Sequence, residues 1–436
     1  MTTVASVDFG AASMRVCRVD LDARPVTCEV VHRAEHVPVR LPDGSLRWDW
    51  DRLVGETITG LGGALERGPI DSIGVDTWAV DYGLLDGDRK LLSAPHSYRS
   101  DRTKAYRQTY RRVAHRRFYE TCGLQVQPFN TIFQLAAHDR AELDAAAHLL
   151  FLPDLVVFHL TGQIATERTN AGSSGLYDLA KRDWSDELID ASGAPRHVFQ
   201  PIVDAGTPAG AWRDIGVHRV AGHDTASAVV AIPAATENTA FVSSGTWLLV
   251  GAERDEPDTS LLAQAENFTN ELGALGGLRF LKNVAGYWLL NECLRQWGNG
   301  DLDGYLERAR KIEEEIPIFD ATDPRFLSPK DMVAEIRLAA GLDERDGDDM
   351  VVRCIIESMA AATAVVIERL GDVNDVVLLG GGAKDDFLSE RIADHARVPV
   401  RRGPVEAAAL GNALVQGIAL GVFSDLADAR RALGPA

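Results

Sequence analysis

Two aspartates stand where a carboxylate could take part in a reaction, and the first is Asp224. It lies in the segment Ala221-Gly222-His223-Asp224-Thr225, where a loop leads into an apolar helical stretch. A carboxylate so placed can accept the proton of a hydroxyl group during phosphoryl transfer to an alcohol. Aspartate is also a common helix N-cap, so capping is the structural alternative.

The second is Asp8, which ends an apolar strand just before Gly10. Mg²⁺ commonly takes one or two carboxylates and completes its coordination with water, which makes Asp8 the metal candidate. The alternative is a turn carboxylate that accepts a hydrogen bond from its own backbone.

Two glycine-centred strand-turn-strand units should position these groups. Aligning Gly10 with Gly245 sets Asp8 opposite Ser243. Glycine tolerates positive φ and lets backbone N–H groups approach a ligand, so two such turns could hold phosphate oxygens. Two ordinary hairpins are the alternative, because glycine turns are common. The units run over Val4–Val19 and Thr239–Val250.

A second correspondence predicts that the whole plan is duplicated. The helical segment Trp50–Glu66 precedes a buried strand at Ile70–Thr77, and Val351–Leu370 precedes a strand that ends at Gly380–Gly382. Ligands of open α/β sheets bind beyond the carboxyl ends of the strands, so Asp76 and these glycines should open into one cleft. We predict an α/β protein with lobes at 1–212 and 213–436, divided after the Pro/Gly/Ala-rich stretch Pro201–Ala211.

Composition limits the class of protein. The 436 residues are 46% hydrophobic and carry a formal net charge of −19, which predicts a soluble enzyme of two lobes and opposes a duplex nucleic-acid surface. The basic run Arg107–Arg117 is the local exception and is read as a solvated helix face. The five cysteines show no CxxC spacing, so neither a zinc site nor a disulfide framework is expected. We expect no signal peptide and no stretch as long as a membrane span, hence a cytoplasmic protein.

Several polar and aromatic residues that follow the buried strand at Ile70–Thr77 have two interpretations. Trp78 and Asp81 could line a polyol site, or Trp78 could belong to the core while Asp81 only ends the strand. Arg99, Asp101 and Arg102 could form a surface ion-pair cluster or support the loop beside such a site.

Taken together, the ordered motifs of the chain resemble those of the FGGY carbohydrate kinases along nearly its whole length. Each motif is weak alone, but their order and spacing are highly specific. They are Val7–Arg15, Ser72–Asp81, Tyr98–Thr103, Pro128–Thr131, Pro153-Asp154, Leu160–Gly162, His223–Ala228, Ser243–Trp247, Leu281–Asn283, Trp288–Leu290, Gly380–Gly382, Gly403–Ala407 and Leu410–Asn412.

The resemblance implies two actin-like (ribonuclease H-like) ATPase lobes with an interdomain cleft, the sugar lying on the N-terminal side and ATP mainly on the C-terminal side. It also implies roles for individual residues. Asp224 would be the catalytic base and Asp8 would organise Mg²⁺. The sugar would be bound by Ala79, His223, Thr225 and Asn283, and ATP by Ala11, Ala12, Ser13, Met14, Arg15, Thr246, Asn291 and Gly381.

The implied reaction is transfer of the γ-phosphoryl group of ATP to the 1-hydroxyl of a ketose, with L-rhamnulose as the expected sugar. The chain departs from the resembled pattern at Ala79, Asn291 and Met14, where a glycine, a glutamine and a small residue are usual. Because an added methyl changes the fit of a pocket, Ala79 keeps L-fuculose, L-ribulose or xylulose open. An actin-like ATP-binding sensor is the alternative of another class. We expect no nucleic-acid or membrane partner, and a monomer or homodimer.

Overall fold

The computed structural model describes residues 2–298, 300–326 and 329–434, which form two compact units. Within the described residues, unit 1 comprises 2–234, 254–280 and 407–434, and unit 2 comprises 235–253 and 281–406. The last helical segment of the chain therefore belongs to the same unit as the first strand. The predicted division near residue 212 stays a prediction.

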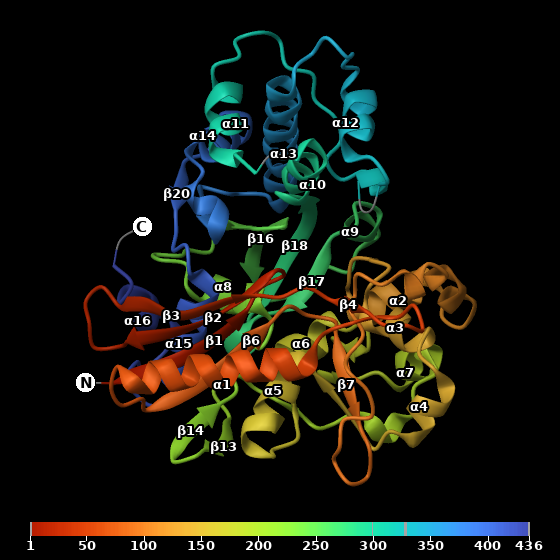
Figure 1. Ribbon diagram of the computed structural model, residues 1–436, viewed down its shortest axis with the longest axis vertical. Helices are drawn as coiled ribbons and strands as arrows, with labels where there is room; N and C mark the ends of the chain where they lie inside the picture. The colour runs from red at the N-terminus through yellow and green to blue at the C-terminus, as the bar shows by residue number, and fades with distance from the viewer. Residues whose placement is uncertain (1, 299, 327–328, 435–436) are drawn as a thin grey trace. The chain divides into compact units, whose positions relative to one another are not determined.

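Unit 1 is built on a mixed sheet of strand order β13-β14-β6-β1-β2-β3 (Figure 1). Its strands are β1 (Thr3–Phe9), β2 (Ser13–Asp20), β3 (Thr27–Glu35), β6 (Ser72–Thr77), β13 (Pro208–Trp212) and β14 (Ile215–His218). The short strands of this unit are β4 (Val39–Arg40), β5 (Leu46–Arg47), β7 (Tyr82–Leu85), β8 (His148–Phe151), β9 (Thr166–Glu167), β10 (Tyr177–Asp178), β11 (Asp183–Trp184), β12 (Ile202–Val203) and β17 (Thr269–Leu272).

Helices cover both faces of this sheet. The helices α1 and α5 share one apolar cluster with β1, β2 and β6, whereas α15 packs on β1 and β6 together with α8. The helices of unit 1 are α1 (Trp50–Glu66), α2 (His115–Cys122), α3 (Thr131–Ala136), α4 (Arg140–Ala145), α5 (Leu152–Thr161), α6 (Arg168–Ser173), α7 (Asp186–Ser192), α8 (Asp224–Val230), α9 (Leu261–Ala265), α15 (Ala407–Ala419) and α16 (Leu426–Arg431).

Unit 2 contains most of the second sheet, whose strand order is β17-β18-β16-β15-β19-β20. The strands not yet given are β15 (Thr239–Ser244), β16 (Trp247–Arg254), β18 (Leu278–Ala285), β19 (Asp375–Leu379) and β20 (Val400–Arg402). The helices are α10 (Trp288–Trp297), α11 (Leu302–Arg310), α12 (Met332–Ala340), α13 (Asp348–Leu370) and α14 (Asp386–Ala396), with a 3₁₀ turn η6 at Gly381–Lys384.

The predicted duplication is confirmed at the level of strand pairing. In unit 1, β1 pairs antiparallel with β2 and parallel with β6, and in unit 2, β15 pairs antiparallel with β16 and parallel with β19. The helix α1 has the predicted bounds. The helix α13 begins three residues before the predicted start, where Asp348 and Asp349 occupy the first turn and favour a helix N-terminus.

One reason given for the glycine turns was wrong. Neither Gly10 nor Gly245 has a positive φ, so left-handed backbone is not what these positions require. A Cβ on Gly245 would meet no atom within 4 Å, so the space beside this turn is open. A glycine with a positive φ does occur elsewhere in unit 2, at Gly380, whose φ is 78°.

The expectation that no stretch is as long as a membrane span was also wrong. The helix α13 is long and apolar enough to cross a membrane, with a mean hydropathy of 1.9 over its most apolar window, but 72% of that window is buried within the protein. Burial against neighbouring helices explains its apolar composition. All five cysteines are free in the structure, and four of them are buried.

The packing of α15 on α8 leaves no room for a side chain at Gly411. A Cβ there would stand 1.7 Å from the carbonyl oxygen of Ser227 in α8. We therefore predict that Gly411→Ala lowers the free energy of unfolding by about 1 to 3 kcal/mol, since backbone has to move. Urea denaturation measures the change.

Gly62→Ala in α1 is the matched control, because a Cβ at Gly62 meets nothing within 4 Å and alanine favours a helix interior. Equal stability of Gly411→Ala and the wild-type protein would contradict the packing described for α8 and α15.

Candidate active site

Two strands of unit 1 end side by side in buried carboxylates. Asp8 of β1 is the register partner of Asp76 of β6, and both residues have 0% exposure. Arg15 Nε donates to Asp8 Oδ2 at 2.7 Å, and Asn412 Nδ2 donates to Asp76 Oδ2 at 2.6 Å. The other oxygen of each carboxylate, Oδ1, is buried without a hydrogen-bond partner. The turn-carboxylate reading of Asp8 was wrong, because its bonded oxygen accepts from a side chain of the next strand.

The loop before α8 lies against the end of β6. The Thr77 backbone N–H donates to the Gly222 carbonyl at 2.9 Å, and Thr77 forms a parallel bridge with His223. His223 is the N-cap of α8, and Asp224 is the first residue of the helix. The capping reading of Asp224 was therefore wrong, which leaves its carboxylate available for another role.

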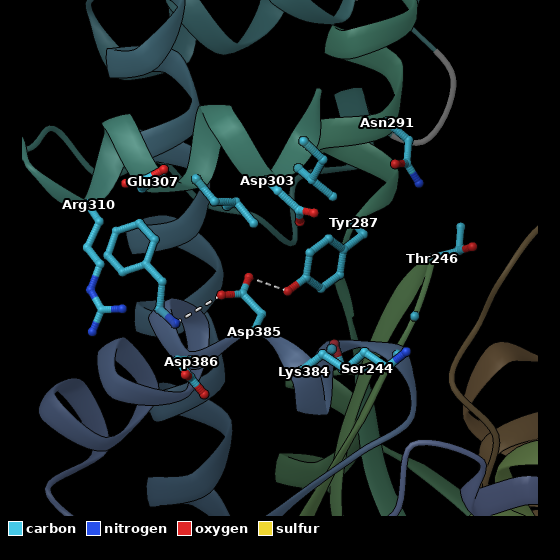
Figure 2. Close-up of a pocket in the computed structure, with 16 residues that line it drawn as sticks. Ser244, Thr246, Tyr287, Asn291, Asp303, Glu307, Arg310, Lys384, Asp385 and Asp386 are labelled. Atoms are coloured by element: carbon cyan, nitrogen blue, oxygen red, sulfur yellow. Dashed lines mark hydrogen bonds between the residues drawn. The ribbon is translucent and has the colours of Figure 1, made fainter. Parts of the chain in front are cut away.

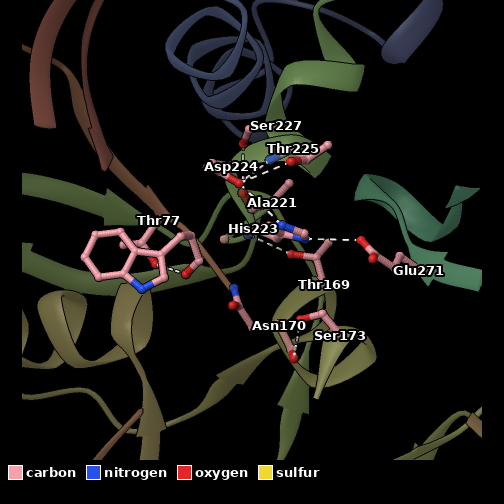
Figure 3. A network of polar contacts seen from close by, with 12 residues as sticks. Thr77, Thr169, Asn170, Ser173, Ala221, His223, Asp224, Thr225, Ser227 and Glu271 are labelled. Carbon is pink, nitrogen blue, oxygen red and sulfur yellow. Dashed lines mark hydrogen bonds and ion pairs between the residues drawn. The ribbon is translucent and has the colours of Figure 1, made fainter. Parts of the chain in front are cut away.

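The two oxygens of Asp224 have different surroundings (Figure 3). Oδ1 accepts from Thr225 N at 2.6 Å and from Thr225 Oγ1 at 3.3 Å, and it lies 3.4 Å from His223 Nε2. Oδ2 has no partner among the residues that the structure describes. Because 24% of the Asp224 side chain is exposed, whereas Asp8 and Asp76 are fully buried, Asp224 is the carboxylate of this group that a substrate in solution can reach.

The three carboxylates affect one another electrostatically. Burial, and next the charge of Asp8, raise the pKa of Asp224 to about 7. Burial and Asp8 also raise the pKa of Asp76 well above its usual range, while the hydrogen bond from Asn412 opposes this. Like charges in a medium of low dielectric constant disfavour simultaneous ionisation. The cluster therefore favours a proton or a cation, and a base with a pKa near neutrality can exchange protons at physiological pH.

The segment after β6 is held rigidly around Ala79. Asp81, 1% exposed, accepts hydrogen bonds from Trp48 Nε1 at 2.7 Å and Trp78 Nε1 at 3.0 Å. Val80 has a φ of 71°, which is strained for a β-branched residue. Ala79 is half-buried between these buried neighbours. Trp78 and Asp81 thus bond to each other inside the core, and Ala79 is the residue of this segment that a ligand can reach.

The two arginines near this segment support loops of unit 1 and do not pair with Asp101. Arg99 donates to the Ala11 carbonyl at 2.7 Å, and Arg102 donates to Gln134 Oε1 at 2.7 Å. Asp101 pairs with Lys104 at the surface. The loop-supporting reading is therefore the one that these contacts favour.

The remaining predicted nucleotide residues of unit 1 are Ala11 and Ala12 in the turn between β1 and β2, and Ser13, Met14 and Arg15 at the start of β2. Gly10 N donates to Ser13 O at 3.0 Å, and Ala11 and Ala12 are partly or fully exposed at the tip. The side chain of Met14 packs in the apolar cluster of the sheet with 0% exposure, so the departure at this position does not change the exposed surface of the turn.

Unit 2 contains a pocket of about 600 Å³ (Figure 2). Three predicted nucleotide residues line it together, namely Thr246 after β15, Asn291 of α10 and Gly381 of η6. A volume of 300 to 1,000 Å³ is usual for small-molecule sites. The other lining residues are Ser244, Gly245, Tyr287, Leu302, Asp303, Leu306, Glu307, Arg310, Gly382, Lys384, Asp385, Asp386 and Phe387.

This pocket has an apolar and a polar part. Leu302, Leu306 and Phe387 offer apolar surface to a planar ring, and Lys384 supplies a cation. Tyr287 Oη donates to Asp385 Oδ2 at 2.5 Å, which fixes two of the lining side chains (Figure 2). A Cβ on Gly381 would meet nothing within 4 Å, so a ligand can approach the backbone there. The lining thus offers apolar surface for a ring together with cationic and anionic side chains, the latter being Asp303, Glu307, Asp385 and Asp386.

Sequence reasoning missed several residues that hold these side chains. Asn412, which bonds Asp76, was noted only as part of a motif, and Arg279, which bonds His223, was not singled out. Asn283 is on β18 in unit 2, and its predicted contact with a sugar stays a prediction. Among the described residues, no three His, Cys, Asp or Glu side chains have the arrangement of a metal site.

Comparison with known proteins shows similarity along the whole chain. Residues 3–239 match the N-terminal domain of the FGGY family of carbohydrate kinases, and residues 240–420 match the C-terminal domain. The rhamnulokinase of Pectobacterium carotovorum is 37% identical, covering 99% of this chain and 90% of that protein. The rhamnulokinase of Enterococcus faecalis is 36% identical, covering 98% and 91%.

Solved structures share the fold. A xylulose kinase from Lactobacillus acidophilus superposes with a TM-score of 0.79 at 17% identity, covering 99% of this chain and 92% of that one. The glycerol kinase of Plasmodium falciparum, solved with ADP, gives a TM-score of 0.79 at 14% identity with the same coverage. At such identities these likenesses concern the fold alone, and they confirm the predicted two-domain α/β class.

The coupling between Asp8 and Asp224 predicts a measurable titration. The Asp224 carboxyl should titrate with a midpoint near pH 7, and Asp8→Asn should lower that midpoint because a neighbouring negative charge is removed. Carboxyl ¹³C chemical shifts of aspartate-labelled protein, assigned with Asp224→Asn, measure both values. A midpoint near 4 in the wild-type protein would contradict the electrostatics described here.

Proposed function

This chain belongs to the FGGY family of carbohydrate kinases and is a sugar kinase, and from this we propose that it is a rhamnulokinase. It transfers the γ-phosphoryl group of ATP to the 1-hydroxyl of L-rhamnulose and yields L-rhamnulose 1-phosphate. The support for this sugar is the 36 and 37% identity over nearly the full chain to proteins named rhamnulokinase. The observation that carries the chemistry is the accessible Asp224 carboxylate with one oxygen held and the other open.

We assign Asp224 as the general base. A sugar hydroxyl is too weak an acid to ionise at neutral pH, so a base must take its proton as the bond to phosphorus forms. The Asp224 oxygen Oδ2, which has no partner in the described part of the chain, accepts this proton, while Thr225 holds Oδ1. The sugar oxygen then bonds to the γ-phosphorus, and the bond from that phosphorus to the bridging oxygen of ADP breaks.

The sugar lies beside this base in the proposal. His223 and Thr225 flank Asp224, and the bridge from His223 to Thr77 brings them to the end of the strand that leads to Ala79. The hydrogen bonds that Trp48 and Trp78 donate to Asp81 keep the neighbouring Ala79 in place. Asn283 is proposed as a further sugar contact on the strength of the family motif alone.

ATP is assigned to the pocket of unit 2, with Thr246, Asn291 and Gly381 around the nucleoside. The turn at Ala11 and Ala12 and the first residues of β2, Ser13, Met14 and Arg15, are proposed for the phosphates. This assignment rests on the apolar and cationic parts of the pocket and on the exposed tip of the turn. The sugar side is thus proposed for the N-terminal part of the chain (1–212) and the ATP side for the C-terminal part (213–436).

The residues around Asp8 fit a magnesium ion. Asp8 and Asp76 each have one buried carboxylate oxygen without a partner, and the cluster carries excess negative charge. Mg²⁺ usually keeps several waters and bonds one or two carboxylates together with substrate phosphates. Asp8 is therefore proposed to hold the ion, with Asp76 behind it. Mg²⁺ bound there supplies charge neutralisation for the transferring phosphoryl group.

The same proposal assigns the protein to the cytoplasm, as a monomer or homodimer whose partners are the sugar and ATP. Its buried apolar helix α13 agrees with a water-soluble enzyme.

A ketose other than L-rhamnulose has one specific observation in its favour. The methyl group of Ala79 is at the accessible point of the segment, so it can exclude one ketose and accept another.

The substrate is tested by coupled ADP release with Mg·ATP and a panel of L-rhamnulose, L-fuculose, L-ribulose, D-xylulose and glycerol. We expect L-rhamnulose to have the highest kcat/KM, and Ala79→Gly to change the ratio between ketoses by about 10- to 200-fold, as one methyl group does in a pocket. Preference for another sugar would replace the substrate and keep the kinase. ADP release that no sugar stimulates would contradict the proposal as a whole.

The base is tested by Asp224→Asn. We expect kcat for sugar phosphorylation to fall by about 10²- to 10⁴-fold, because the amide cannot accept the proton, with the Kd of ATP unchanged by calorimetry. The matched control is Asp51→Asn, an exposed carboxylate in the first turn of α1, which should retain full turnover. An Asp224→Asn enzyme with wild-type kcat would remove Asp224 from the mechanism.

A further inference from the structure

The side chain of Arg279 is fully buried beside the proposed base. Its exposure is 0%, and its Nη2 lies 3.0 Å from Glu271 Oε2. The same nitrogen lies 3.1 Å from His223 Nδ1 and donates to the Leu272 carbonyl at 3.2 Å. A chain of polar contacts therefore runs from Glu271 through Arg279 and His223 to Asp224.

The direction of these contacts determines the proton on His223. A guanidinium group can only donate hydrogen bonds, so His223 Nδ1 must accept from Arg279 and carry no proton. In a neutral imidazole the proton is then on Nε2. Nε2 lies 3.4 Å from Asp224 Oδ1, which is longer than a formed hydrogen bond, so a proton on Nε2 faces that oxygen and favours its negative charge. The backbone N–H of His223 is fixed as well, because it donates to Thr169 Oγ1 at 3.0 Å (Figure 3).

Charge in the same cluster keeps the imidazole neutral. Burial, and next the charge of Arg279, hold the pKa of His223 well below its usual range. Glu271, whose Oε2 lies 3.5 Å from His223 Nδ1, would favour the opposite state, an Nδ1–H that donates to the carboxylate. Arg279 Nη2 lies closer to Nδ1, at 3.1 Å, and forms an ion pair with Glu271 at 3.0 Å, so it competes with that arrangement.

We propose that Arg279 is a positioning residue of the kinase: by donating to His223 Nδ1 it fixes the Nε2–H tautomer, which turns an N–H toward Asp224 Oδ1 and leaves Oδ2 for the hydroxyl of the sugar. The inference rests on the proposed function of Asp224 and deepens it. Glu271 is the group that keeps the guanidinium in place.

Stability alone does not account for this arrangement. Taking an arginine and a glutamate out of water is expensive, and a buried ion pair is often no more stabilising than apolar residues of similar size. An ion pair that only filled the core would have no need to place one of its N–H groups on the imidazole next to the base. The contact to Nδ1 is the feature that a purely structural role leaves unexplained.

The test compares Arg279→Met with the wild-type enzyme, using ¹⁵N chemical shifts of histidine-labelled protein, assigned with His223→Gln, together with steady-state kinetics. We expect the wild-type protein to show a neutral His223 with the proton on Nε2. In Arg279→Met, Glu271 becomes the partner of Nδ1, so the Nε2–H tautomer should be lost in favour of Nδ1–H or the imidazolium. We expect kcat to fall by about tenfold or more, since the base loses its orientation. The Kd of ATP should not change.

A second variant separates positioning from folding. In Arg279→Met combined with Glu271→Gln, the glutamine amide can donate to Nδ1, and no buried charge is left unpaired. We expect this double variant to regain the Nε2–H tautomer and most of the lost kcat.

If Arg279→Met fails to fold, Arg279→Lys takes its place, because an ammonium group also donates to Nδ1 and should preserve the tautomer.

The control Arg353→Met removes a largely buried arginine from Glu357 in α13 and should leave the His223 signals unchanged. An Arg279→Met protein that keeps both the Nε2–H tautomer and the wild-type kcat would overturn the inference. A double variant or an Arg279→Lys protein that is folded but has Nδ1–H would overturn it equally. A wild-type protein that phosphorylates no sugar would end the proposed function, and the tautomer of His223 would still be measured independently.

Discussion

The closeness of three mutually repelling carboxylates, two of them fully buried, is the constraint on which unit 1 depends. Asp8 and Asp76 are neighbours in the sheet, and Asp224 is close enough to both to share their electrostatic field. An isolated buried charge is very unfavourable, and a like neighbour adds to the penalty. The protein offsets it with Arg15 on Asp8 and Asn412 on Asp76, leaving one oxygen of each unpaired. The negative charge of these carboxylates is therefore not balanced until a cation or a proton binds.

The two units use one strand topology for different chemistry. In unit 1 the ends of the parallel pair β1 and β6 carry Asp8 and Asp76, which attract cations and protons. In unit 2 the corresponding pair β15 and β19 ends in Ser243 and Leu379, followed by Gly380 with its positive φ. A Cβ on Gly380 would lie 2.9 Å from the Ser244 carbonyl oxygen, so the position has no room for a side chain. The duplicated sheet supplies acid groups in one unit and backbone surface with a pocket in the other.

The sequence was sufficient for features that depend on local pattern. The alternation of apolar residues around Gly10 and Gly245 predicted both hairpins, and helix composition predicted the bounds of α1. It was insufficient for contacts between distant segments, such as Asn412 with Asp76 or Arg279 with His223, since no local pattern encodes them. The predicted roles of Asp224 and Asp8 remain proposals, although the structure removes the capping and turn-carboxylate readings that competed with them.

The contribution of α15 to unit 1 has a consequence for how the protein is made. This helix comes from residues 407–419, yet it packs on β1, β6 and α8 and supplies Asn412 to Asp76. During synthesis the first strands leave the ribosome long before their partner helix exists. Until that helix arrives, one face of the sheet is uncovered and Asp76 has no amide bonded to it. Since α15 also packs on α8, the helix that begins with Asp224, the surroundings of the proposed base are complete only after residues 407–419 have been made.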